Sequence, residues 1–137
     1  MKKLTIIVAI AILLSVQGFA QVKLTVDVKN IQSSEGKILV GLFNSEGTFL
    51  EKAYQKTSAN AKEGHMQFEF DNVPEGTYTI SVIHDKNNNG SLDKNMIGIP
   101  TEPYGISMDG KSMFGPPSYE DAVFKVGKQN LTLDISL

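Results

Sequence analysis

Side-chain oxygen atoms recur at every second position in residues 85–93 of this sequence, DKNNNGSLD. The residues that provide them are Asp85, Asn87, Asn89, Ser91 and Asp93. A chain that wraps around an ion points alternate residues inward, and the sharp turn at the sixth position favours glycine, here Gly90. We therefore expect these five residues, with Ser91 contributing its carbonyl oxygen, to bind one calcium ion.

The rest of an EF-hand is missing from this segment. Met96 stands where an EF-hand has its bidentate glutamate, and neither flank has the pattern of an amphipathic helix. Because only Asp85 and Asp93 carry charge, we expect a weak site with a Kd of about 10⁻⁴–10⁻³ M. Since both lie in an expected loop, we also expect that replacing them with Asn leaves the fold intact. The alternative is an ordinary exposed turn, in which Asn and Gly adopt positive φ and Asn closes Asx-turns.

Catalytic candidates are few in this sequence. His84 beside Asp85 has the composition of a general base with its orienting carboxylate, but neighbours in a strand point to opposite faces. Ser107 lies in GISMDG, one residue away from a G-x-S-x-G nucleophile elbow, without the strand-turn-helix setting. Further carboxylates that could form a glycosidase pair are Glu102, Glu120 and Asp121. We favour a non-catalytic module for binding or envelope structure, and the alternative is a secreted hydrolase, of esterase or glycosidase type, with its site in residues 98–120.

Two-residue periodicity predicts mostly strands. Residues 22–28 alternate apolar and polar side chains, and residues 37–43 are apolar on both faces, which predicts a half-buried strand and a central strand. Residues 65–70 and 77–83 flank the turn VPEG, so we expect them to pair as a hairpin, with Tyr78 opposite Phe68 or Phe70.

The later part of the chain is rich in residues that interrupt regular structure. Residues 94–120 contain four of the five prolines, which predicts one long loop folded against the sandwich, and strands are expected at 122–126 and 131–137. The pattern of residues 48–64 is compatible with a short helical turn or with an irregular edge of a sheet, and the sequence does not decide between them. About seven short strands separated by turns predict an all-β protein, an antiparallel β-sandwich of immunoglobulin-like or transthyretin-like type.

The first 20 residues have the pattern of a secretory signal peptide. Lys2 and Lys3 precede an apolar run from Leu4 to Val16, and small residues stand before a cut that would leave Gln21 first. The run is shorter than the roughly 20 residues that span a bilayer. We expect export to the periplasm or the exterior, and one domain over residues 21–137 that does not span the membrane.

Composition narrows the function further. Without Lys2 and Lys3 the chain has 11 Lys against 15 acidic residues, a net charge of −4, and it has no arginine. This balance argues against nucleic acid as a partner. The absence of cysteine excludes disulfides, thiol catalysis and lipid attachment through cysteine.

Three motifs carry a resemblance to a known family. D-x-N-x-N-G-x-L-D at residues 85–93, G-I-P-x-E-P-Y-G at 98–105 and P-P-S-Y-E-D-A at 116–122 closely resemble the bacterial family called domain of unknown function 2141. VPEGTYTISVIHD also resembles carboxypeptidase-regulatory and transthyretin-like sandwiches. The resemblance implies an exported bacterial β-sandwich without an established activity, in which the 85–93 loop and residues 98–107 form a functional surface. The expected partners are another envelope protein or a glycan, bound at the loop end of the sandwich.

Overall fold

The computed structural model describes residue 18, residues 21–110 and residues 115–137. The strands are β1 Gln21–Ile31, β2 Lys37–Phe43, β3 Gln55–Asn60, β4 Gly64–Pro74, β5 Gly76–Asp85, β6 Tyr104–Ile106, β7 Phe124–Val126 and β8 Leu131–Ser136. The short helices are η1 Glu46–Thr48, η2 Ser107–Asp109 and α1 Tyr119–Ala122. The expected signal peptide lies outside the described residues apart from Gly18.

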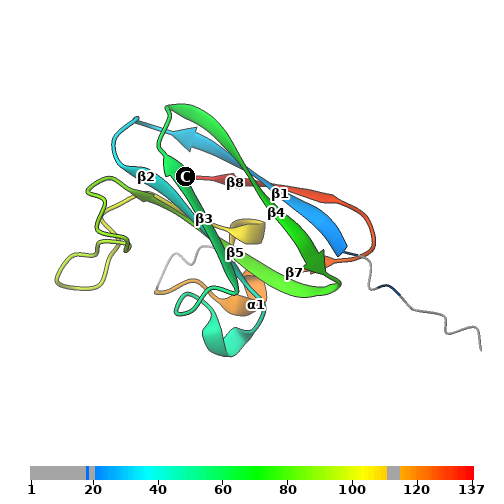
Figure 1. Ribbon diagram of the computed structural model, residues 1–137. Coiled ribbons are helices and arrows are strands. Elements are labelled where there is room, and N and C mark those ends of the chain that lie inside the picture. The colour runs from blue at the N-terminus through cyan, green and yellow to red at the C-terminus, as the bar shows by residue number, and fades with distance from the viewer. Residues whose placement is uncertain (1–17, 19–20, 111–114) are drawn as a thin grey trace, which may run out of the picture.

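The strands form two sheets that face each other (Figure 1). One sheet has the order β4-β1-β8, and the other has the order β3-β2-β5-β6, with β7 paired to the first residues of β5. The predicted all-β sandwich is confirmed, with eight strands among the described residues in place of about seven. The pair β1–β8 is parallel, whereas the other strand pairs are antiparallel.

Alternation of side chains explains how the sheets pack. In β1, Val22, Leu24, Val26 and Val28 are buried between the sheets, and the residues between them face outward. The prediction that residues 37–43 form a central strand is confirmed, because β2 lies between β3 and β5. Apolar side chains from the inner faces of both sheets form one core cluster.

The predicted hairpin of residues 65–70 and 77–83 is wrong. β4 pairs with β1 and β5 pairs with β2, so the turn at Glu75 carries the chain from one sheet to the other. Phe68, Phe70 and Tyr78 are buried in the same core cluster. Two strands with an apolar face can bury it side by side or across a sandwich, and the sequence pattern is the same in both cases.

The expected 94–120 loop contains three short elements. β6 pairs with β5, η2 follows β6 directly, and α1 begins at Tyr119. The helical residues of α1 also shorten the strand expected at 122–126, which starts at Phe124. The open region 48–64 contains β3 as the edge strand of the larger sheet.

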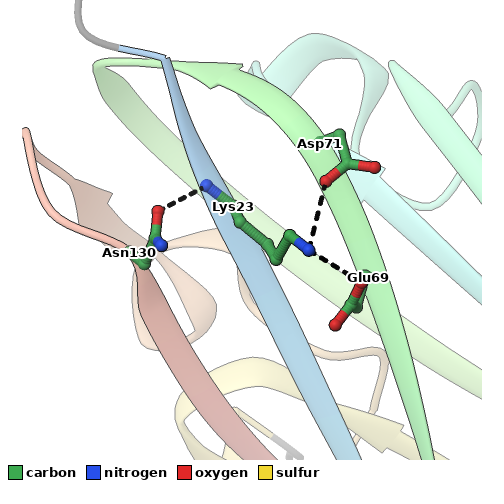
Figure 2. Close-up of polar contacts among 4 residues, drawn as sticks. All are labelled: Lys23, Glu69, Asp71 and Asn130. Carbon is green, nitrogen blue, oxygen red and sulfur yellow. Dashed lines mark hydrogen bonds and ion pairs between the residues drawn. The ribbon is translucent and has the colours of Figure 1, made fainter.

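Polar contacts on the outer face of the three-stranded sheet tie its strands together (Figure 2). Lys23 Nζ lies 3.2 Å from the Glu69 carboxylate and 3.8 Å from that of Asp71, and the Lys23 backbone N–H donates to Asn130 at 2.9 Å. The hydrogen bond to Glu69 and the charges of Glu69 and Asp71 raise the pKa of Lys23. Because these side chains are 46–68% exposed, the ion pairs add little to the stability of the sheet.

Close contact between β6 and β8 gives a test of the packing. A Cβ atom at Gly105 would lie 2.5 Å from Ile135 Cγ2 and 2.8 Å from the Ser136 carbonyl oxygen. We predict that Gly105→Ala lowers the free energy of unfolding by about 2 kcal/mol, measured by denaturant unfolding. The control is Gly47→Ala, because a Cβ atom there meets nothing within 4 Å. Equal stability of the two variants would contradict this packing.

Candidate functional site

The structure places the five predicted calcium ligands at the end of β5 and in the segment after it. Three of them converge, because the side-chain amides of Asn87 and Asn89 both donate hydrogen bonds to the Asp93 carboxylate. Asn89 Nδ2 lies 2.5 Å from Asp93 Oδ1, and Asn87 Nδ2 contacts Asp93 Oδ2. The alternate spacing therefore brings three side chains to one point.

Asx-turns, the alternative interpretation of this segment, are also present. Asn87 Oδ1 accepts the Asn89 N–H at 3.2 Å, and Asn89 Oδ1 accepts the Ser91 N–H at 3.0 Å. Ser91 is exposed, and its part in these contacts is this backbone N–H, while the predicted ligand was its carbonyl oxygen. Gly90 has φ of +81°, so the sharp turn predicted at the sixth position is confirmed.

Asp85 has a different position from the one expected. It is the last residue of β5, it is fully buried, and its carboxylate accepts the Asn89 N–H at 3.1 Å and the Gly90 N–H at 2.8 Å. The expectation that replacing Asp85 and Asp93 together with Asn leaves the fold intact assumed that both residues lie in a loop. This assumption is wrong for Asp85, which belongs to β5. An amide at this position has one oxygen acceptor where the carboxylate has two.

Glu102 is a part of this site that the sequence reasoning assigned elsewhere. Its side chain is buried, Oε1 accepts the Lys86 N–H at 2.9 Å, and Oε2 accepts the Asp93 N–H at 3.0 Å. Glu102 and Asp85 together accept four backbone N–H groups of the 85–93 loop. One feature of the sequence could have indicated this role. A loop without strand partners needs acceptors for its backbone N–H groups, and Glu102 is the first carboxylate residue after the loop.

The base of the loop is held by the turn between β1 and β2. His84 is fully buried, its Nε2 lies 2.8 Å from the Glu35 carbonyl oxygen, and its backbone N–H donates to the Pro103 carbonyl oxygen at 2.9 Å. Gly36 has φ of +70°, and a Cβ atom there would lie 2.0 Å from the Asp85 carbonyl oxygen. Nε2 is the donor in this hydrogen bond, because a carbonyl oxygen only accepts, and Nδ1 has no hydrogen-bond partner among the described residues. His84 thus supports the end of β5.

The serine proposed for the hydrolase alternative is used in packing. Ser107 is fully buried, and its Oγ donates to the Ala122 carbonyl oxygen at 2.5 Å while accepting the Ile80 N–H at 2.9 Å. Glu120 and Asp121 are exposed in α1, whereas Glu102 is buried. Residues 111–114 of the proposed hydrolase segment lie outside the described residues. Within the described ranges there is no group of three or more His, Cys, Asp or Glu that could hold a metal ion.

A groove of about 880 Å³ crosses the outer face of the larger sheet. Its lining includes Leu39, Lys56 and Ile83 from three neighbouring strands and Tyr54 from the segment before β3. A second groove of about 390 Å³ is lined in part by Tyr104, and Gly90 lines both. The turn of the 85–93 loop therefore forms part of the wall of two surface grooves.

The role of Glu102 leads to the next prediction. In Glu102→Gln, an amide NH₂ replaces one acceptor oxygen, so one of the two N–H groups loses its partner. We expect the free energy of unfolding to fall by about 1–3 kcal/mol, and hydrogen exchange to accelerate at the amides of Lys86 or Asp93. The control is Glu120→Gln, at an exposed position of α1. Unchanged exchange at both amides would show that Glu102 does not hold the loop.

Comparison with known proteins identifies a family. The model of the family described as "Uncharacterized protein conserved in bacteria (DUF2141)" matches residues 26–134. No curated protein and no solved structure matches the chain. The matched residues run from β1 to β8 and include the whole 85–93 loop and Glu102. The chain belongs to the DUF2141 family.

Proposed function

We propose that this protein is an exported β-sandwich module for binding, and that its 85–93 loop binds one calcium ion. The observation that carries the proposal is the convergence of the Asn87, Asn89 and Asp93 side chains on a loop whose backbone is already held by two buried carboxylates. A preformed loop loses less conformational entropy when it binds an ion.

The chemistry of the amide side chains supports a hard cation. The oxygen and nitrogen atoms of an Asn amide exchange places when the group rotates by half a turn. Such a rotation of Asn87 and Asn89 would direct two neutral oxygens toward the place where their NH₂ groups now contact the Asp93 carboxylate. Amide and carboxylate oxygens are the ligands that calcium takes, and a set without sulfur favours calcium over zinc.

The same geometry explains why the affinity should be low. Rotating the two amides breaks their hydrogen bonds to Asp93 and the two Asx-turn hydrogen bonds to the backbone. Asp85 adds a second negative charge, but each of its oxygens already accepts a backbone N–H. We therefore infer a Kd of about 10⁻⁴–10⁻³ M, which suits a compartment where calcium is abundant.

A binding role is proposed in preference to hydrolysis because of how the candidate residues are used. Ser107 Oγ makes two hydrogen bonds inside the protein, and both oxygens of Glu102 accept backbone N–H groups. A nucleophile or a general acid needs access to substrate. The proposed partner is an envelope protein or a glycan, and the two grooves beside the 85–93 loop are the surface that it would occupy.

Export is part of the proposal, and two observations support it. The first 20 residues have a charged start, a short apolar run and small residues before the cut. β1 begins at Gln21, so cleavage there would leave each of the described strands in the processed chain. No helix among the described residues is long and apolar enough to cross a membrane.

We predict that mass spectrometry of the protein recovered from the periplasm or the medium gives a chain that begins at Gln21. The expected mass is that of residues 21–137. Recovery of the chain from the membrane fraction with residues 1–20 still attached would contradict processing at this position.

Calcium binding is tested by calorimetry and by thermal unfolding, each with millimolar calcium and with EDTA. At a few times Kd the ion should stabilise the fold by about 1 kcal/mol, which corresponds to about 3–5 °C in Tm. Asp93→Asn should abolish both the heat of binding and the shift, because it removes the charge at the convergence point. Asp109→Asn, at an exposed position outside the loop, should change neither. If the wild-type protein shows neither heat of binding nor a shift in Tm, the loop does not bind calcium and is an Asx-rich turn.

A further inference from the structure

Three large apolar side chains are exposed together beyond the proposed calcium loop. Met96 is 104% exposed, Ile97 is 79% exposed and Ile99 is 54% exposed. Figure 1 shows the yellow-green segment after β5 extending away from both sheets. Single apolar residues on a surface are ordinary, but three within four residues of a projecting tip form a patch that water solvates poorly.

Hydrogen bonds fix the shape of this tip. The Asn95 N–H donates to the Ile99 carbonyl oxygen at 2.9 Å, and the Gly98 N–H donates to the Asn95 carbonyl oxygen at 3.0 Å. Asn95 Oδ1 also accepts the N–H groups of Ile97 at 3.1 Å and of Ile99 at 3.0 Å. At the base, the Thr101 N–H donates to the Asp93 carbonyl oxygen at 2.8 Å. The apolar side chains are therefore presented by an ordered turn.

The hydrogen bonds of the tip also determine how many backbone N–H groups would lack a partner in an apolar environment. Three of the four N–H groups in residues 96–99, those of Ile97, Gly98 and Ile99, have acceptors inside the turn. A segment that enters a lipid layer needs its backbone donors satisfied internally, because the hydrocarbon offers no partners. A peptide that adds to the edge of a sheet in another protein would instead present free N–H groups.

We propose that residues 96–99 insert into a lipid surface, with Met96, Ile97 and Ile99 reaching the boundary between headgroups and acyl chains. The exposed Lys94 lies two residues before Met96, at the base of the tip, and complements anionic headgroups. Three side chains offer much less than the roughly 800 Å² per partner that a stable protein interface requires, whereas insertion into lipid has no such minimum. The contact is weak and reversible.

The absence of tryptophan from the chain allows a test at single positions. Ile97→Trp places a fluorophore at the tip, and Tyr54→Trp places one at an exposed position away from it. Each variant is purified in the form that the cells produce. It is then mixed, in buffer with EDTA, with vesicles of phosphatidylcholine and phosphatidylglycerol whose acyl chains either carry bromine or do not. EDTA separates this test from the proposed calcium site, since insertion does not require the ion.

We expect Ile97→Trp to show a blue-shifted emission and quenching by the brominated chains, and Tyr54→Trp to show neither. In the otherwise native protein, the double change Met96→Ser and Ile97→Ser should weaken vesicle binding about tenfold or more, with Tm unchanged. Vesicles of phosphatidylcholine alone should bind less, because Lys94 loses its anionic partner.

Three outcomes would overturn the proposal. If vesicles do not change the emission of Ile97→Trp, the tip does not enter lipid, and a protein partner would be the better explanation of its apolar side chains. Equal quenching at both positions would indicate adsorption without insertion of the tip. A blue shift that appears without vesicles and grows with protein concentration would indicate contact between copies of this chain.

Discussion

Four backbone N–H groups in the 85–93 loop have their acceptors on two buried carboxylates, Asp85 and Glu102. Hydrogen bonds to ionised acceptors are stronger than neutral ones, and a buried carboxylate without partners would be costly. The loop and the two carboxylates therefore depend on each other. This mutual dependence fixes the path of the chain from β5 to β6 without a strand partner for the loop.

The sandwich places the two carboxylates where they can act together. Asp85 ends β5, a central strand of the larger sheet, and Glu102 precedes β6, which pairs with β5 at residues 104–106. The turn at Gly36 packs against the Asp85 carbonyl oxygen so closely that no side chain fits there. The segment held in this way presents two groups of side chains. Polar side chains gather around Asp93 on one part of the loop, and apolar side chains project at its tip.

Side-chain periodicity predicted the elements better than their partners. Residues 22–28 and 37–43 were predicted correctly, because alternation in the first and apolar residues on both faces of the second leave a direct pattern in the sequence. The hairpin of β4 and β5 was wrong because pairing within a sheet and packing across the core bury the same faces. Gly90 was predicted from its place in the motif, since a positive φ is a local requirement. The role of Glu102 was not predicted, because its N–H partners lie 9 and 16 residues away.

The central claim is that the 85–93 loop and the tip after it are ordered by the protein itself, before any ligand binds. The most direct test is the measurement of backbone NMR order parameters for residues 86–101 in EDTA. We predict values near those of the strands, about 0.85, because carboxylates and turn hydrogen bonds fix the N–H groups of this segment. Values below about 0.6 across these residues, with rigid strands on both sides, would contradict the account.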